Sequence, residues 1–553
     1  MEVCAINLWS LSPKIASFFM SIAMFFASLF PFMNSADFSI DTTNELYEVK
    51  NVVNTLNCRN PYEFDENTRP DGENDVISFV RYIELMRATG GNENDDPFVE
   101  PLDRTVLDDY DFSRIIASCR GILNLGAKPF IKLGNVPLKL SDDPIIGSMN
   151  SNVRPPADYD EWYRFLIAYL GALIDNFGLD EVKTWRFGVF TEYENNDWFY
   201  AGDKDPETSF VEYCKIYDYS VKALTDELGD DVYVGAHSMT VIEGLWDERD
   251  FIAHCANGTN YATGEKGTHI SDLSSSFYDS KINEKTSGMR PAECIEFLRG
   301  CAESVGLYGL DYGFDEGRIL TGNYGQDAEA LVPRAVGWNI QSAYDAKLYK
   351  EISEAGADWF SSWGYTSGGS VNGYPSVAYH TAERFSKFAG ASAVSVESKT
   401  NGSKKNEKGS FASYDKENGV INIMAYNFKE SYNYFTPSKM SFKINAPDFD
   451  GKKIEIKTYR IDSDCNFFDE WQSDARKYIK DKTAMSWSPD AYTLDGNILS
   501  DELREKYENE LRDKYVECSA LDFTSEETEC GGEIDLSLFV EANTSVFIVI
   551  TAK

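Results

Sequence analysis

The stretch Trp185-Arg-Phe-Gly-Val-Phe-Thr-Glu-Tyr-Glu-Asn195 decides the fold class of this chain. Its first half is a short apolar run, typical of a buried strand, and the polar residues begin where such a strand leaves the core. The first carboxylate after the run is Glu192. In a (β/α)8 barrel the functional side chains lie at the carboxyl ends of the strands, so the pattern places Glu192 at the mouth of a barrel.

The rest of the region between about residues 51 and 390 repeats this pattern of apolar runs separated by amphipathic, helix-like stretches. Strands are predicted at 52–56, 82–86, 129–133, 184–190, 232–236, 274–278, 310–314 and 359–363. Helices are predicted at 111–125, 158–177, 209–228, 291–305 and 331–355. Strands that alternate with helices in this way predict an α/β fold, a (β/α)8 TIM barrel over residues 37–390. A doubly wound sheet is disfavoured because the chain has no GxGxxG or GxxxxGK[ST] turn.

After residue 390 the pattern changes to alternating polar and apolar positions. Such segments occur at 420–426, 440–444, 453–460 and 544–551, and they predict an accessory β-sandwich domain over residues 391–553. A charged, helix-like insertion near 497–515 interrupts it, and the strand-like residues 38–41 are candidates to pair with this domain.

Residues 1–36 have the pattern of a signal peptide or membrane anchor. An uncharged apolar run over residues 15–33 follows Lys14. The run approaches the roughly 20 residues that span a bilayer, so cleavage and anchoring both stay open. We expect a secreted or cell-surface protein that contacts the membrane only if this segment is uncleaved.

The charge of the chain excludes several classes of partner. It carries 91 acidic against 52 basic residues, a formal net charge of −39. Such a surface repels nucleic acids and anionic membranes, so nucleic acid is not an expected partner. A neutral polysaccharide is not repelled, and an aromatic content of 14% supplies flat apolar faces for sugar rings.

Cysteines and histidines give little support for metal chemistry. Cys4 lies in the predicted leader, and the other cysteines form an odd set without CxxC spacing, which argues against structural zinc and a full disulfide framework. The pairs to test for bridges are Cys294 with Cys301 and Cys518 with Cys530. The four histidines show no HxxxH or HExxH spacing, so no metal and no cofactor are expected.

The ends of the predicted strands carry residues typical of a sugar site. In chain order these are Arg87, Asn135, Thr191, Glu192, His237, Tyr278, Glu316 and Trp363. Glu192 and Glu316 follow strands on opposite sides of the barrel, so they can face each other across a bound ring. A retaining mechanism needs two carboxyl groups about 5 to 5.5 Å apart, one to protonate the leaving oxygen and one to attack the anomeric carbon.

Other interpretations of these residues stay open. Asp311, Asp315 and Glu329 compete with Glu316, and the seventh strand could instead cover residues 318–321. Glu192 could be a solvated loop carboxylate, and His237 a core histidine with its hydrogen bonds satisfied.

The segment around Glu192 resembles the Trp-x-Phe-x-x-Trp-Asn-Glu-Pro motif of glycoside hydrolase family 39, a member of the clan of retaining (β/α)8 glycosidases. Trp185 and Phe187 are in register with that motif. The resemblance implies that Glu192 is the acid/base and that Glu316, near the end of strand seven, is the nucleophile. It also implies that Arg87 and Tyr278 hydrogen-bond to the nucleophile.

The motif also departs from the family. Phe190 stands for Trp, Thr191 for Asn and Tyr193 for Pro, and Asp-Glu-Gly replaces Thr-Glu-Trp around Glu316. The amide contact to the sugar 2-hydroxyl is therefore lost or supplied by another residue, such as Asn135.

The resemblance predicts a retaining glycoside hydrolase that acts by double displacement on a plant or microbial oligo- or polysaccharide, with β-xylosides as the first substrates to test and Trp363 as the floor of the sugar subsite. The alternative is a non-catalytic carbohydrate-binding protein on a degenerate barrel, which does not need two carboxylates within roughly 10 Å. An inverting hydrolase, with a separation of roughly 6.5 to 9.5 Å, is the third possibility.

Overall fold

The computed structural model of this chain describes residues 34–58, 60–70, 78–240, 244–279, 289–319, 339–362, 370–371, 374–403, 405–429, 431, 434–467, 470, 473–474, 477 and 505–553. The chain divides into two compact units. One comprises Asn51–Leu320 and Glu351–Gly373, and the other comprises Met1–Lys50, Thr321–Lys350 and Tyr374–Lys553. Residues 1–33 of the predicted leader lie outside the described residues.

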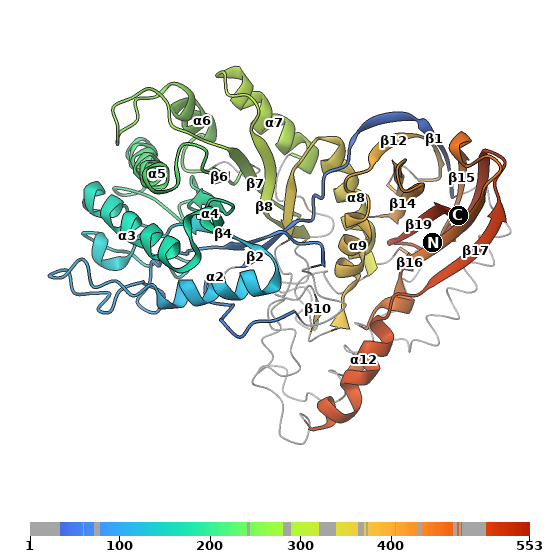
Figure 1. Ribbon diagram of the computed structural model, residues 1–553, viewed down its shortest axis with the longest axis horizontal. Coiled ribbons are helices and arrows are strands. Elements are labelled where there is room, and N and C mark those ends of the chain that lie inside the picture. Colours follow the sequence, from blue (N-terminus) through green and yellow to red (C-terminus); the bar gives the residue numbers. More distant parts are fainter. Residues whose placement is uncertain are drawn as a thin grey trace, which may run out of the picture. The chain divides into compact units, whose positions relative to one another are not determined.

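The first unit is built on a parallel eight-stranded sheet whose strands follow one another in chain order (Figure 1). These strands are β2 (Thr55–Cys58), β3 (Tyr82–Leu85), β4 (Lys128–Leu133), β5 (Arg186–Val189), β6 (Val234–Ser238), β7 (Asp272–Asp279), β8 (Asp311–Ile319) and β9 (Trp359–Ser362). The last strand returns to the first, because the backbone N–H of Phe360 donates to the carbonyl oxygen of Val52 at 2.6 Å. The predicted (β/α)8 barrel is confirmed, and each predicted strand overlaps an observed one.

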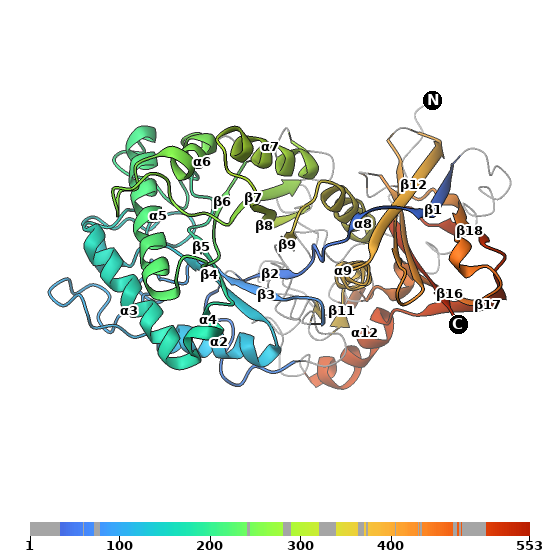
Figure 2. The same cartoon turned by 45° about the horizontal axis from the view of Figure 1, so that its top comes forward.

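Helices lie on the outer side of these strands, as Figure 2 shows. They are α2 (Ser113–Leu125), α3 (Tyr159–Phe177), α4 (Leu179–Val182), α5 (Pro206–Leu228), α6 (Glu248–Asn257) and α7 (Pro291–Ser304), with a 3-10 turn at Leu138–Leu140. The start of α3 is fixed by Asp158, whose side chain accepts hydrogen bonds from two backbone N–H groups of the first turn. Trp162 and Phe165 lie on the buried face of α3. Trp162 also donates to Ser220 of α5 at 3.0 Å, which ties neighbouring helices together.

The second unit contains one nine-stranded mixed sheet in the order β17-β16-β19-β14-β13-β12-β1-β15-β18. The strands are β1 (Ser35–Glu48), β12 (Ser392–Asn401), β13 (Glu407–Asp415), β14 (Val420–Phe428), β15 (Ser438–Asn445), β16 (Lys453–Ile461), β17 (Phe523–Glu529), β18 (Glu533–Val540) and β19 (Thr544–Ala552). Phe38 of β1 is paired with Phe442 of β15, and Ile423 of β14 is paired with Ile548 of β19. Strands β12 and β13 separate these two pairs in the sheet, yet all four residues share one buried core. The accessory β-domain is therefore a single sheet that curls around its own core.

The position of β1 adds a long-range connection to this sheet. β1 pairs with β12 in antiparallel and with β15 in parallel orientation. Residues 35–36, which the sequence placed at the end of the leader, begin this strand, and residues 37–48, which it placed at the start of the barrel domain, continue it. Ala36 is fully buried there.

The remaining described elements are short or helical. They are α8 (Asn339–Glu354), β10 (Ser370–Val371), β11 (Tyr374–Pro375), α9 (Val377–Ser386), 3-10 turns at Pro447–Phe449 and Ser463–Cys465, a π-helical turn at Tyr507–Leu511 and α12 (Arg512–Ser519). The described part of the predicted insertion near 497–515 is thus helical. None of the helices in the described ranges has the length and apolar character that a bilayer crossing requires.

The cysteines do not form the two bridges suggested by the sequence. All nine cysteines of the described residues are free thiols. Cys294 and Cys301 lie on the same helix, α7. Seven residues along a helix span about 10.5 Å, which exceeds the Cα separation of roughly 7 Å that a disulfide tolerates. Cys530 is buried in the core of the curled sheet, and Cys518 is only partly buried in α12.

Candidate active site

An irregularity in the pairing of β7 with β8 sets the geometry of the site. Ser275 pairs with Phe314, but Ser276 pairs with Glu316, so Asp315 is an extra residue in β8. Such a bulge changes the side to which the following side chain points. Asp315 lies inside the barrel, where its Oδ2 accepts from Ser274 Oγ at 2.7 Å. Paired residues on neighbouring strands share a face, so Glu316 lies on the same inner face as Ser276.

Glu192 follows β5 through an unusual backbone conformation. Phe190 and Glu192 have positive φ values of 64° and 43°, a region that non-glycine residues rarely adopt and that clusters at functional sites. This turn directs the Glu192 carboxyl group back to the barrel mouth. Its Oε1 accepts from Ser276 Oγ at 2.6 Å, and its Oε2 accepts from Asn195 Nδ2 at 2.7 Å. Glu192 is therefore held by two donors at the end of the barrel.

The environment of Glu192 suits an acid. Only 8% of the residue is exposed, so it is not a solvated loop carboxylate. Burial raises the pKa of the Glu192 carboxyl group above its usual value, although the hydrogen bonds from Ser276 and Asn195 act in the opposite direction. The group therefore keeps its proton to a higher pH than an exposed glutamic acid.

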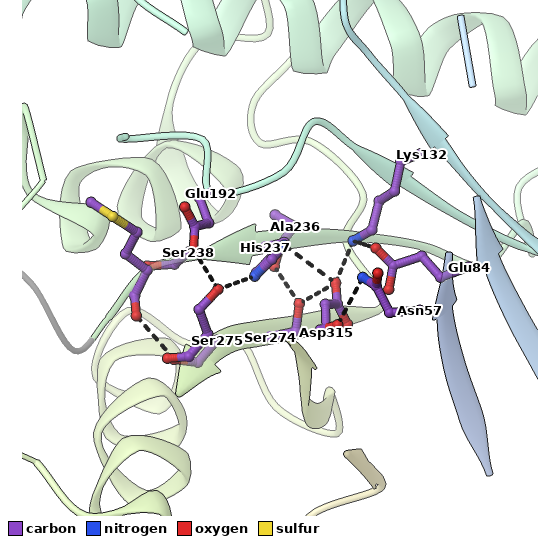
Figure 3. A network of polar contacts seen from close by, with 12 residues as sticks. Asn57, Glu84, Lys132, Glu192, Ala236, His237, Ser238, Ser274, Ser275 and Asp315 are labelled. Carbon is purple, nitrogen blue, oxygen red and sulfur yellow. Dashed lines mark hydrogen bonds and ion pairs between the residues drawn. The ribbon is translucent and has the colours of Figure 1, made fainter. Parts of the chain in front are cut away.

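A charged network fills the barrel interior beneath this carboxyl group (Figure 3). Lys132 of β4 forms an ion pair with Asp315 of β8, and its Nζ lies 4.0 Å from Glu84 Oε1. Trp359 Nε1 donates to the other oxygen of Asp315 at 2.7 Å. Burial alone would raise the pKa of Asp315, but its interactions with Lys132, His237 and Ser274 together outweigh burial, and the pKa lies below its usual value. Asp315 is thus an ionised, fully engaged carboxylate.

Glu84 has the opposite character. Burial raises the pKa of its carboxyl group well above the usual value, and the negative charge of Asp315 raises it further. The neutral form of Glu84 leaves Lys132 and Asp315 as a balanced pair. Buried charges are tolerated when they are paired in this way.

His237 of β6 connects this network to Glu192. Its Nε2 lies 2.8 Å from Ser276 Oγ, and its Nδ1 lies 3.8 Å from Asp315 Oδ2. The ring is fully buried, and burial lowers the pKa of His237 to about 3. The imidazole is therefore neutral at ordinary pH. His237 thus contacts Glu192 through Ser276, and its role in a sugar site stays a prediction.

Glu194 also lies close to Glu192 in sequence but has a different role. It is completely buried, and its Oε1 accepts from Ser238 Oγ at 2.6 Å and from the backbone N–H of Met239 at 2.7 Å. Burial raises its pKa to about 8. These bonds attach the segment after β5 to the end of β6. Glu194 therefore holds the backbone that follows Glu192 in place.

Two of the predicted substrate-binding residues form hydrogen bonds or ion pairs with residues of the loops. Arg87 Nη1 lies 3.1 Å from Ser151 Oγ and 3.2 Å from Asp95 Oδ2. Asn135 Nδ2 donates to the carbonyl oxygens of Asn152 and Trp198 at 3.0 and 2.9 Å. The two amide hydrogens of Asn135 therefore order the loops, and the contact to a sugar that the sequence suggested would have to use its oxygen.

The remaining predicted residues are described in part or not at all. Thr191 is buried between Phe190 and Glu192. Tyr278 belongs to β7, but its side chain lies outside the described part of the structure, and Trp363 lies outside the described residues altogether.

Several residues of the site were not expected to contribute to it. They are Lys132, Asn195, Ser274, Ser276 and Trp359. A lysine inside the apolar run of β4 and three consecutive serines inside β7 are signals that sequence alone contains, because polar groups in a buried strand need partners. Among the residues that the structure describes, no group of three or more His, Cys, Asp or Glu side chains is placed to hold a metal ion.

Part of the chain is similar to known protein sequences. Residues 95–293 match the model of the family described as Glycosyl hydrolases family 39. A β-xylosidase from Geobacillus stearothermophilus is 29% identical over 148 residues, which cover 27% of this chain and 28% of the relative. A β-xylosidase from Caldicellulosiruptor saccharolyticus is 29% identical over 143 residues, 26% of this chain and 28% of the relative. The chain thus aligns with little more than a quarter of the length of these curated relatives.

Solved structures resemble nearly the whole chain. A monomeric β-xylosidase from Caulobacter crescentus CB15 has a TM-score of 0.64 at 14% identity, and the match covers 93% of this chain and 99% of that one. An enzyme of glycoside hydrolase family 39 from Xanthomonas axonopodis pv. citri has a TM-score of 0.63 at 13% identity, with 94% and 98% covered. At such identities these matches show the fold, a barrel with a curled β-domain.

The fold is a (β/α)8 barrel with a curled β-domain, and a part of the barrel is similar to a family of glycoside hydrolases. The segment similar to glycoside hydrolase family 39 covers less than half of the chain, and Glu192 lies within it. Glu316 lies beyond that segment, so its assignment rests on the bulge in β8 and on its pairing with Ser276.

Proposed function

We propose that this chain hydrolyses glycosidic bonds by double displacement, with Glu192 as acid/base and Glu316 as nucleophile. One observation carries the proposal. Ser276 hydrogen-bonds to Glu192 through its side chain and pairs with Glu316 through its backbone, so the two carboxyl groups flank the same residue. Retaining enzymes place their two carboxyl groups about 5 to 5.5 Å apart, so this proposal requires both groups to reach the same glycosidic bond.

The reaction follows from the protonation of the two groups. Protonated Glu192 gives its proton to the leaving oxygen while Glu316 attacks the anomeric carbon, and the product is a covalent glycosyl ester of Glu316. Ionised Glu192 then removes a proton from water, which attacks the anomeric carbon and releases Glu316 as a carboxylate. Glu192 ends protonated, so one bond is hydrolysed and both groups return to their starting states.

The surroundings of the two carboxyl groups support this division of roles. Burial favours the neutral form of Glu192, as an acid requires. Asn195, three residues further on, supplies an amide donor to Glu192 Oε2. Tyr193, which replaces the proline of the family motif, is fully buried and stacks on Trp246 with ring centroids 5.2 Å apart. Tyr193 therefore packs the segment after β5 against Trp246.

For the substrate we propose a plant or microbial oligo- or polysaccharide, and β-xylosides as the first class to test. Both curated relatives named above are β-xylosidases, although they align over a limited segment. The acidic chain, with its net charge of −39, favours a neutral sugar polymer over an anionic one.

The test is hydrolysis of a panel of aryl β-glycosides by the full chain and by the Glu192→Gln, Glu316→Gln and Glu316→Gly variants. Glu417→Gln, which changes an exposed carboxylate in the other unit, is the matched control. We expect hydrolysis of at least one glycoside with retained anomeric configuration by NMR, loss of several orders of magnitude in Glu316→Gln, and recovery of Glu316→Gly with azide.

Other outcomes would contradict the proposal in distinct ways. An inverted product would assign the two carboxyl groups to an inverting mechanism. Glycan binding without hydrolysis, unchanged in both glutamate variants, would identify a carbohydrate-binding protein on a barrel that has lost its activity.

A further inference from the structure

Ser276 has two partners that compete for a single proton. Its hydroxyl oxygen lies 2.6 Å from Glu192 Oε1 and 2.8 Å from His237 Nε2. All three residues are buried, so water does not compete for these contacts. A serine hydroxyl has one hydrogen and can donate to only one of the two neighbours at a time. The direction of the hydrogen bonds therefore depends on which neighbour offers an acceptor.

When Glu192 is ionised, its oxygen can only accept. Ser276 then donates to Glu192, and His237 must donate from Nε2 to Ser276 Oγ. The neutral imidazole consequently carries its hydrogen on Nε2.

When Glu192 is protonated on Oε1, donor and acceptor exchange roles in both hydrogen bonds of Ser276. Glu192 donates to Ser276 Oγ, Ser276 donates to His237 Nε2, and the ring hydrogen must sit on Nδ1. Asn195 donates to Glu192 Oε2, which leaves Oε1 as the oxygen that is free to carry the proton. The two states differ by one proton, bound at Glu192, and His237 is neutral in both.

We propose that Ser276 is a positioning residue that couples the protonation of Glu192 to the tautomer of His237. The structure supplies a reason for both tautomers to be accessible. Nδ1 of His237 faces Asp315 Oδ2 at 3.8 Å, so a hydrogen on Nδ1 meets a carboxylate. Lys132 already neutralises the charge of Asp315, so the carboxylate attracts a hydrogen on Nδ1 only weakly. Both tautomers of His237 therefore stay accessible.

The charged and titratable groups around Glu192, Ser276 and His237 come from several strands. They are Glu84 on β3, Lys132 on β4, Asp197 after β5, Asp272 on β7, and Asp315 and Glu316 on β8. His237 has a pKa lowered to about 3 by burial, so the ring changes tautomer without changing charge at ordinary pH. The coupling therefore links Glu192 to the ion pair of the barrel interior.

The role in catalysis rests on the proposed function, but the coupling can be measured without substrate. The experiment uses the full chain with only its histidines labelled with 15N. The chain has four histidines, and the ring of His237 is identified by its absence in His237→Gln. Ring 15N shifts distinguish the two tautomers and are followed across the pH range in which the chain stays folded.

The expected result is a change of His237 from the Nδ1–H form at low pH to the Nε2–H form at high pH. In Glu192→Gln, the amide group donates to Ser276 at every pH, so His237 should stay in the Nδ1–H form. In Ser276→Ala the transition should vanish, and Ser276→Thr, which keeps the hydroxyl, should restore it. Ser275→Ala is the matched control, because Ser275 lies on the same strand and donates to Met239 O at 3.2 Å.

Two results would overturn the proposal. One is a single His237 tautomer at all pH values that is also found in Glu192→Gln. The other is a transition that persists with the same midpoint in Ser276→Ala. The measurement needs no activity, so inactive protein with a normal tautomer transition would reject the proposed function and leave the coupling intact.

Discussion

Ser276 and Glu316 are backbone partners on neighbouring parallel strands, one residue after the register between β7 and β8 shifts at Asp315. Without the extra residue, strand alternation would put one of the two adjacent acidic side chains outside the barrel. The bulge brings both inside, where they have different partners. Asp315 belongs to the interior ion pair with Lys132, and Glu316 is paired through its backbone with Ser276, whose side chain contacts Glu192.

If Glu192 is the acid/base, the loss of activity on its replacement should depend on the leaving group of the substrate. Glu192→Gln should lower kcat/KM by roughly 10²- to 10⁴-fold for an alkyl glycoside, because general acid catalysis contributes about that much. An aryl glycoside with an acidic phenol needs little protonation and should lose less in the bond-breaking step. Steady-state kinetics on both substrates checks this, and an equal loss on both would contradict the assignment.

The interior ion pair predicts a large effect on stability. Lys132→Met leaves buried Asp315 without its cation, and breaking such a pair costs about 3 to 5 kcal/mol of the free energy of unfolding. The double variant Lys132→Met/Asp315→Asn should lose less than the sum of the single losses. Urea unfolding followed by tryptophan fluorescence measures this.

A control for that prediction lies on the same strand. Lys128 pairs with Glu181 at 2.5 Å, but both side chains are about 30% exposed. Lys128→Met should therefore cost no more than about 1 kcal/mol. Equal losses of the free energy of unfolding in Lys128→Met and Lys132→Met would show that the interior pair contributes no more to stability than a surface pair.

The raised pKa of Glu194 predicts that this residue makes a pH-dependent contribution to the free energy of unfolding. Its pKa is about 8 in the folded chain against an ordinary value of 4.5, so the folded state binds the proton more tightly. Its contribution is fully present below pH 4.5 and is lost as pH rises toward 8, by up to about 1.4 kcal/mol per pH unit. Glu194→Gln should become progressively more stable than the parent chain across this window. Thermal unfolding at several pH values tests this, with Glu417→Gln expected to show a constant difference.

Ser276 predicts a shift in the pH profile of activity. Its hydroxyl donates to Glu192 and so lowers the pKa of that carboxyl group. Ser276→Ala should move the basic limb of kcat to higher pH, because Glu192 loses a donor that favours its ionised form. A purely structural role would reduce activity equally at all pH values, and the profile would keep its shape.

The barrel could be predicted because its strands are buried on both faces and appear as continuous apolar runs. The stretch before Glu192 is the clearest case. Helix α6 was not among the expected helices. Only four of its ten residues are buried, Phe251, Ile252, His254 and Cys255, so its apolar pattern is short. The two suggested disulfides were wrong. The helix predicted at 291–305 already contains both Cys294 and Cys301, so the sequence pattern itself argued against a bridge between them.

The sequence by itself determined the fold class and the place of Glu192 at the end of a strand, because these depend on local patterns of apolar and polar residues. Only the tertiary structure decided which residues surround that carboxyl group. Ser276 and His237 come from other strands, and the inward position of Glu316 depends on a register that two strands set together. Strand register is a property of a pair of strands, and no single stretch of sequence contains it.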